Sequence, residues 1–195
     1  MTAVSDIGRY LAETITSLYL VIVVLRGLLQ ASRADFYNPI SQFIARATNP
    51  PLLLMRKLVP AGQRFDISIV LLALLVQGIG FSSTLMLSGF MPPSVLIVAI
   101  WSVIGVTALI VNTYLIALII MIVLSWVAPG SRHPAVILVY QITHPVIAPI
   151  RSLLPNMGGL DFSPIVIFIV INVIQIALRH MAVATGLPPS LIMGL

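Results

Sequence analysis

Thr48-Asn49-Pro50 and Arg56-Lys57-Leu58-Val59-Pro60 recur 95 positions later, without a gap, as Thr143-His144-Pro145 and Arg151-Ser152-Leu153-Leu154-Pro155. The match continues into Asp66-Ile67-Ser68, which aligns with Asp161-Phe162-Ser163. Self-similarity at a fixed separation is the mark of a duplicated structural unit. The chain is therefore expected to be two copies of one unit: a membrane helix, a basic loop broken by prolines, and a second membrane helix.

The composition indicates a membrane protein. Hydrophobic residues make up 59% of the 195 residues and charged residues only 8%, far from the balance of a soluble domain. A chain of this length cannot bury so much apolar surface in its own core. The absence of cysteine excludes disulfides, cysteine-ligated zinc, iron–sulfur clusters and thiol catalysis.

Four apolar stretches reach the length of about 20 residues that a bilayer-spanning helix needs. They run from Tyr10 to Ser32, Ile67 to Ser88, Ser94 to Trp126 and Phe162 to Thr185. The third is longer than one crossing requires, so it is expected to tilt, to bend near Gly105 or to project beyond the membrane.

The predicted fold is an all-α membrane protein of about four transmembrane helices. They form two parallel-related hairpins, each with a short amphipathic interfacial helix in its cytoplasmic loop. Residues 10–88 make the first repeat, residues 89–104 a connector and extension of the third span, and residues 105–185 the second repeat.

The basic residues predict the orientation. The two long loops carry most of them: Arg33, Arg46, Arg56, Lys57, Arg64, Arg132 and Arg151. The other side has only Arg9 and Arg179. Because loops rich in Arg and Lys stay in the cytoplasm, both termini are expected outside.

The first long loop is expected to hold two short helices. Ile40, Phe43, Ile44 and Ala47 follow a helical spacing after Asn38-Pro39, in a segment ended by Asn49-Pro50-Pro51. This piece is expected to lie at the membrane surface, and Leu52–Val59 forms the second piece. The second repeat copies the plan over Pro134–Thr143 and Ile147–Leu154.

Four basic residues are candidates for binding lipid or a partner. Arg56 and Arg151, which are equivalent across the repeat, either anchor the loops at phosphate level or form bidentate sites for an anionic lipid headgroup or a partner's carboxylate. Lys57 adjoins Arg56. Arg26 lies near the end of the first span, where it either extends to the headgroups or has a buried functional role.

A set of prolines and capping residues forms a repeated structural motif at the loops: Pro50, Pro145, Pro60, Pro155, Asp66, Asp161, Ser163 and Pro164. Ser163 directly before Pro164 is a strong helix-start signal, and Asp66 is expected to cap the second span. Capping is favoured for both aspartates over a role in moving an ion or a proton.

Few polar residues lie within the apolar stretches, so each is informative. Gln77 and Asn172 are equivalent across the repeat and are expected to make hydrogen bonds between spans, joined by Asn112 and Gln175. The stretches contain no acidic ring, filter-like glycine run or charge-rich helix, which argues against a conduction pathway.

Catalysis is not expected. His133, His144 and His180 lack the spacing of metal ligands, and no phosphate-binding glycine loop or paired carboxylates occur. No metal site and no cofactor are expected.

The second half carries motifs of a known family. Ser125-Trp126, Pro134, the run Tyr140–Pro145, Pro149-Ile-Arg151-Ser-Leu-Leu-Pro155 and Gly158-Gly-Leu-Asp-Phe-Ser-Pro164 resemble the signature of the YggT family of bacterial inner-membrane proteins. Asp35-Phe-Tyr-Asn-Pro39-Ile-Ser-Gln-Phe43 resembles the first repeat of two-repeat members. The chain departs from the pattern at Ala61–Arg64, where the family has a glycine-rich turn, and at Ile69, which replaces a proline.

This resemblance implies a multi-pass protein of the bacterial inner membrane, so the termini that the basic residues place outside are expected in the periplasm. Bacterial members are linked to osmotic-stress tolerance with potassium uptake and to division. Plastid relatives assist haem attachment to a membrane cytochrome or affect nucleoid distribution. The leading hypothesis is a membrane helper or scaffold that assists assembly of a membrane complex, and the alternative is ion uptake. The expected partners are the lipid bilayer, including anionic lipid, a membrane protein not yet identified and further copies of the chain, but not nucleic acid.

Overall fold

The computed structural model describes residues 3–57, 59, 62, 66–154 and 161–188. Over these residues the chain forms helices and no strand, so the prediction of an all-α protein is confirmed. The helices are α1 (Ala3–Ala31), α2 (Pro39–Met55), α3 (Ile67–Leu87), α4 (Val95–Val127), α5 (Pro134–Leu153) and α6 (Ser163–Ala184).

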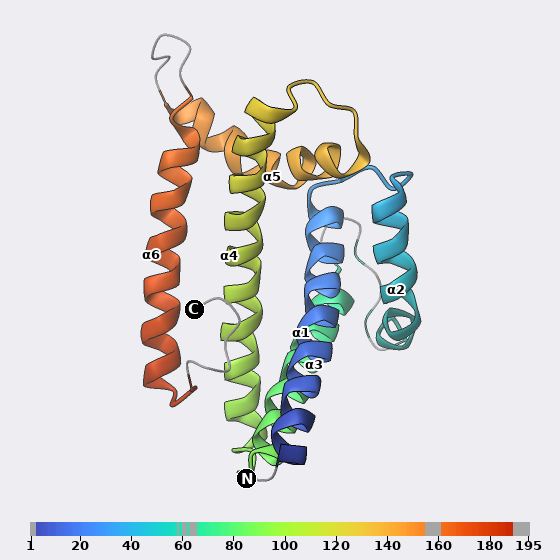
Figure 1. Ribbon diagram of the computed structural model, residues 1–195, viewed down its shortest axis with the longest axis vertical. Coiled ribbons are helices and arrows are strands. Elements are labelled where there is room, and N and C mark those ends of the chain that lie inside the picture. The colour runs from blue at the N-terminus through green and yellow to red at the C-terminus, as the bar shows by residue number, and fades with distance from the viewer. Residues whose placement is uncertain (1–2, 58, 60–61, 63–65, 155–160, 189–195) are drawn as a thin grey trace.

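Four of the helices lie side by side along the long axis of the molecule, and α5 crosses that direction at the end where α4 finishes and α6 begins (Figure 1). Helix α1 packs mainly against α3, while α4 contacts both α3 and α6 and so joins the two repeats. Helix α2 packs against α1 and α3.

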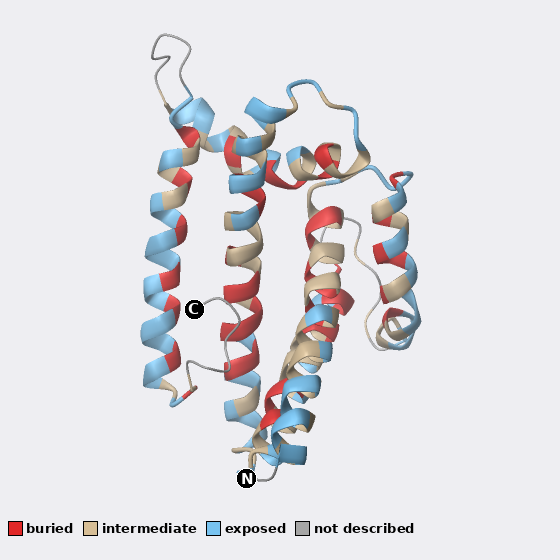
Figure 2. Cartoon of the chain, viewed as in Figure 1, coloured by how far each residue is buried: buried red, intermediate tan, exposed pale blue. Residues whose placement is uncertain are grey.

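Apolar side chains cover the outside of the bundle. Exposed residues follow the outward faces of α6, α4 and α1, and buried residues are confined to the inward faces (Figure 2). Even the best-buried candidate span has only 39% of its apolar window buried. Exposing so much apolar surface to water is unfavourable, whereas contact with lipid is not. The fold is therefore that of a multi-pass membrane protein.

The described residues contain five helices that are long and apolar enough to cross a membrane, one more than the sequence predicted. The additional candidate is α5, which falls in the segment expected at the interface. Length and composition alone admit it, and its direction across the bundle distinguishes it from the other four (Figure 1). The four-helix count and the paired-hairpin arrangement stay predictions.

Helix α4 is continuous over its 33 residues, with no break at Gly105. A Cβ atom at Gly105 would lie 3.1 Å from Cδ of Gln77 and 3.2 Å from Cζ of Phe81. The glycine therefore allows α3 to approach α4 closely, and the predicted bend near this residue is not found.

Helices α2 and α5 both continue through internal prolines. The prediction that Asn49-Pro50-Pro51 ends the first piece is wrong, because α2 continues to Met55. Likewise α5 passes through Pro145 and Pro149. An interior proline removes one helical hydrogen bond. The carbonyl that Pro51 leaves without a partner belongs to Ala47, and it accepts a long hydrogen bond of 3.4 Å from the Tyr19 hydroxyl.

The two surface helices differ in direction. The first part of α2 runs alongside α1, whereas α5 crosses the ends of α4 and α6 (Figure 1). The direction of α5 is the one expected of a helix that lies at the membrane surface, and that of the first part of α2 is not. The placement of either helix relative to a membrane stays a prediction.

The buried apolar side chains of the described residues form two clusters, and each cluster contains residues of both repeats. The first includes Val23 and Leu52 together with Leu138 of α5, and the second includes the equivalent residues Leu118 and Ile147 together with Phe81 of α3. Val23, Leu52, Leu118 and Ile147 are almost inaccessible, at 0%, 0%, 0% and 5% exposure respectively. Equivalent positions of the two repeats are therefore buried alike, and the clusters also pack the repeats against each other.

Candidate functional site

An arginine and an aspartate join the end of each surface helix to the start of the next long helix. We call each pair a clasp: Arg56 with Asp66 in the first repeat and Arg151 with Asp161 in the second. In the first clasp, Nη2 of Arg56 donates to Oδ2 of Asp66 at 2.8 Å. The other carboxylate oxygen accepts the backbone N–H of Ser68 at 3.0 Å and so caps α3.

The second clasp repeats this arrangement. Nη2 of Arg151 donates to Oδ2 of Asp161, and Oδ1 of the same carboxylate accepts the N–H of Ser163 at 2.9 Å. Helix α6 begins at Ser163 itself with Pro164 in its first turn, so the aspartate, not the serine, supplies the capping oxygen. Pro60 and Pro155, predicted in the same motif, lie outside the described residues.

The clasps differ in their exposure to solvent or lipid. The side chain of Asp66 is 0% exposed and that of Arg56 is 28% exposed, against 37% for Asp161 and 64% for Arg151. A buried ion pair is strongly destabilised when one partner is removed, whereas an exposed pair contributes little. We therefore expect the first clasp to contribute more to the stability of the fold than the second clasp.

The surroundings of Asp161 favour its ionised form. The Ser163 hydroxyl has the largest effect and lowers the pKa of the Asp161 carboxyl. Partial burial raises the pKa, while Arg151 and the Ser163 N–H lower it further. The pKa of Asp161 therefore lies below its ordinary value, and the charge that Arg151 contacts persists into acid.

The starts of the surface helices are also duplicated. Asn38 caps α2 by accepting the N–H of Ile40 at 2.9 Å, and Nδ1 of His133 accepts the N–H of Ala135 at 3.3 Å to cap α5. Both residues precede a proline in the first helical turn. Asn38 also joins the repeats, because its Nδ2 donates to the carbonyl of Pro134 at 2.8 Å.

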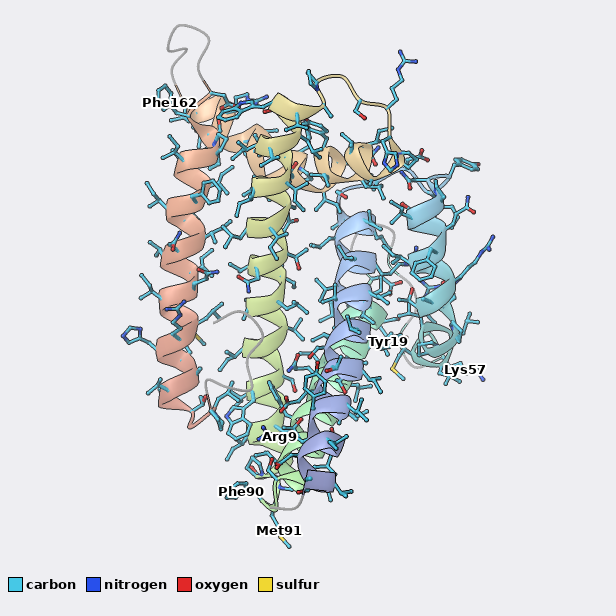
Figure 3. The ribbon with its side chains drawn as sticks, viewed as in Figure 1. Arg9, Tyr19, Lys57, Phe90, Met91 and Phe162 are labelled. Atoms are coloured by element: carbon cyan, nitrogen blue, oxygen red, sulfur yellow. The ribbon has the colours of Figure 1, made fainter. Side chains whose placement is uncertain are left out.

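Two further candidates are placed differently. Lys57 lies exposed at the outer edge of the molecule, beyond the end of α2 (Figure 3). Arg26 is partly buried on α1, with its guanidinium 6.0 Å from the ring of Phe36. Arg26 and Arg56 line the same cavity of about 360 Å³. Of the four basic residues predicted to bind lipid or a partner, the structure places Arg26 and Arg56 around one cavity, and both belong to the first repeat.

The polar residues between the spans pair differently from the prediction. Nε2 of Gln175 donates to Oδ1 of Asn112 at 2.8 Å, which links α6 to α4. Asn172 instead donates to the carbonyl of Phe168 in its own helix. Gln77 lies against Gly105 of α4. The expected interhelical role thus falls to Asn112 and Gln175, because Asn172 faces the outside of the bundle.

A large groove opens in the second repeat between α4, α5 and α6. It has a volume of about 1040 Å³ and is lined by Trp126, Tyr140, His144 and both members of the exposed clasp, among others. The groove brings together predicted residues from three helices. Aromatic and apolar side chains make up most of its lining, together with His144 and the charged pair.

Sequence reasoning missed the pairing within each clasp. It assigned the arginines to anchoring at phosphate level or to sites for an anionic lipid headgroup or a partner's carboxylate, and it assigned the aspartates to caps. The arginine and the aspartate nevertheless stand ten positions apart in both repeats. That shared separation was the available signal. Ser41, which lines the cavity beside Arg26 and Arg56, has no sequence signal of its own.

The fold and the paired clasps define a helical multi-pass membrane protein built by internal duplication. The model of the CCB3/YggT family matches residues 6–86 and 100–182, one segment in each repeat. The chain belongs to this family, and the two-repeat prediction is confirmed.

The chain is similar over nearly its whole length to bacterial relatives. It is 44% identical over 193 residues to the uncharacterized protein PA0392 of Pseudomonas aeruginosa, covering 98% of both chains. It is 38% identical over 163 residues to the protein encoded in the proC 3' region of Vibrio alginolyticus, covering 82% of this chain and 86% of that one. It is 34% identical over 191 residues to YggT of Escherichia coli K12, covering 95% and 97%. No solved structure matches the chain.

Proposed function

We propose that the chain is a membrane scaffold that holds a partner membrane protein against α2 and α5 and so assists assembly of a membrane complex. One observation carries the proposal: α2 and α5 are each fixed at both ends by duplicated polar contacts. A cap holds its start and a clasp holds its end. A surface fixed in this way is pre-organised, which lowers the entropy lost when a partner binds.

The outward faces of these helices support the proposal. Phe43 and Leu53 on α2 are 63% and 60% exposed, and Leu153 at the end of α5 is 79% exposed. The groove beside α5 adds Trp126 and Tyr140. Large apolar and aromatic side chains on a rigid frame are typical anchors for a partner helix.

The test is site-specific photo-crosslinking in the membrane from Phe43 and Leu153, followed by mass spectrometry. Matched control positions are Ile79 and Val173, which are 65% and 60% exposed on the spans α3 and α6. The scaffold reading expects one membrane protein captured from α2 and α5 and not from the controls. Capture of lipid alone at every position would reject it.

Ion uptake that supports osmotic-stress tolerance is the second candidate. The hydrogen bond between Asn112 and Gln175 favours it, because polar side chains within spans often mark a pathway. Potassium flux into liposomes that contain the purified chain, and its loss in Gln175→Leu, would support this function. An equal flux in liposomes without protein would exclude it.

The proposed setting is the bacterial inner membrane with the long loops in the cytoplasm and both termini in the periplasm. The excess of Arg and Lys in the loops supports this orientation. Reporters active on one side of the membrane, fused to each terminus, test it. A cytoplasmic C-terminus would reverse the orientation.

A further inference from the structure

A small cavity in the first repeat concentrates positive charge. It lies between the carboxyl end of α1, the loop after it and both ends of α2, and its volume is about 360 Å³. Arg26, Arg33 and Arg56 line it together with Gln30, Phe36 and Ser41, and no carboxylate is among the lining residues. We call it the arginine cavity.

Three polar atoms of the cavity lining are buried without a hydrogen-bond partner. They are Nε of Arg26, Nε of Arg56 and Oγ of Ser41. Ser41 as a whole is only 4% exposed. Buried donors without partners are unfavourable, and native proteins rarely leave several of them together. Because these three atoms are themselves closed off from solvent, an anion in the cavity would accept from them only after their side chains turn towards it.

The surrounding charges do not compensate the arginines. Asp66 already binds Nη2 of Arg56 and the N–H of Ser68. The carboxyl end of α1 contributes a partial negative charge of about half an electron, which three guanidiniums exceed. Phe36 contacts the Arg26 guanidinium through its ring face and accepts no N–H bond from Nε.

The backbone at Arg33 has an unfavourable conformation. Its φ is +52°, the left-handed region in which glycine is usual after a helix, and it is the one non-glycine residue with positive φ in the described part of the chain. An arginine at this position strains the backbone and places a third cation on the cavity. Strain retained at one position is typical of a functional requirement.

The second repeat lacks the equivalent site. Met121 aligns with Arg26, Ala128 with Arg33 and Val136 with Ser41, and Arg151 alone retains its charge. The second copy of the unit has apolar side chains at three of these positions, so the polar groups are particular to the first copy.

We propose that the arginine cavity binds a phosphate group, carried by a phospholipid headgroup or present as the free ion. A tetrahedral phosphate offers acceptor oxygens in several directions, which suits a cavity lined by three guanidiniums and a hydroxyl. The volume is at the lower end of the about 300–1,000 Å³ usual for ligand sites, so a headgroup phosphate with part of its glycerol fits as well. This proposal does not depend on the scaffold role.

The test compares the full chain with a variant in which the second repeat supplies the residues. Arg26→Met with Ser41→Val installs what stands at Met121 and Val136, so the variant should fold. Arg46→Gln removes the same charge from the exposed face of α2, away from the cavity, and is the matched control. Circular dichroism confirms helical content in all three proteins.

Delipidated protein is titrated with short-chain phosphatidylglycerol, with inorganic phosphate against chloride at equal ionic strength, and with diacylglycerol, which lacks phosphate. Thermal unfolding and native mass spectrometry are the measurements. The wild type and Arg46→Gln should be stabilised by a phosphate source and not by diacylglycerol. The double variant should bind that source at least about tenfold more weakly. Without any phosphate it should unfold at a higher temperature than the stripped wild type, because no unpaired cation is buried.

The outcomes separate the sources. Stabilisation by inorganic phosphate assigns the free ion, and stabilisation by the lipid alone assigns the headgroup. Equal binding by the double variant and the wild type would overturn the proposal. So would a wild type that responds to neither source, or that responds to diacylglycerol as strongly as to phosphatidylglycerol.

Discussion

The difference between the two clasps predicts a difference in stability. Replacing Arg56 by Met leaves the carboxylate of Asp66, which is 0% exposed, without its ionic partner. Removal of one member of a buried ion pair costs about 3–5 kcal/mol. Because the Arg56 side chain is 28% exposed, we reduce the expected loss to about 2–4 kcal/mol.

The same change in the second repeat should have a small effect. Arg151 and Asp161 are 64% and 37% exposed at their side chains, so Arg151→Met should cost about 0–1 kcal/mol. The free energy of unfolding is measured in mixed micelles by titration with sodium dodecyl sulfate and circular dichroism. The double variant Arg56→Met with Asp66→Asn should recover part of the loss, because it buries no unpaired charge.

Two results would refute this reasoning. One is an equal loss for Arg56→Met and Arg151→Met, which would mean that burial does not control the strength of the clasp. The other is a double variant in the first clasp that is no more stable than Arg56→Met alone. That result would assign the loss to the packing of the arginine stem and not to the stranded carboxylate.

Three further predictions concern packing, mid-membrane polarity and pH. Gly80→Ala places a Cβ only 2.6 Å from the Thr16 side chain of α1, so it should lower the free energy of unfolding by about 1–3 kcal/mol in the same assay. Gly8→Ala, whose Cβ would have its nearest neighbour at 3.8 Å, is the control and should be neutral or stabilising. Gln175→Leu should cost about 1 kcal/mol of stability, because it removes the hydrogen bond to Asn112 that joins α6 to α4. Asn172→Leu should change stability by less than about 0.5 kcal/mol, because Asn172 bonds within its own helix. Equal losses would contradict the assigned pairing. Because folding lowers the pKa of Asp161, its ionised carboxylate stabilises the fold above the unfolded pKa of about 3.9, and this stabilisation is lost as the pH falls through the folded pKa. An NMR titration that follows the carboxyl carbon of Asp161 should give a midpoint below about 3.9. A midpoint above that value would be inconsistent with the clasp.

The duplicated elements were predictable because they depend on local sequence. Asn38-Pro39 and His133-Pro134 each combine a capping side chain with a proline suited to the first helical turn, and both start helices as local rules require. The long apolar run of α4 likewise predicts a helix, and its glycine has a packing role that only a neighbouring helix reveals.

Contacts between distant segments were not predictable in the same way. Pro50 and Pro51 are strong helix breakers in isolation, yet α2 continues through them with Tyr19 of α1 bonded to a released carbonyl. The arginine cavity is a sharper case. It depends on residues from α1, the loop and both ends of α2, and on the direction of α2 along α1, which the amphipathic pattern did not specify.

The hydrogen bond from Asn38 to the carbonyl of Pro134 links the start of α2 to the start of α5. Two separate single-repeat polypeptides would form this link only by meeting in the membrane, whereas one polypeptide holds the partners at a local concentration of the order of millimolar. Two repeats in one polypeptide can also differ in sequence, whereas the two subunits of a homodimer cannot. A homodimer would carry Ser41 on both sides, but the fused chain keeps serine in one copy and valine in the other. A duplicated chain can therefore carry a charged cavity in one half and a mostly apolar groove in the other.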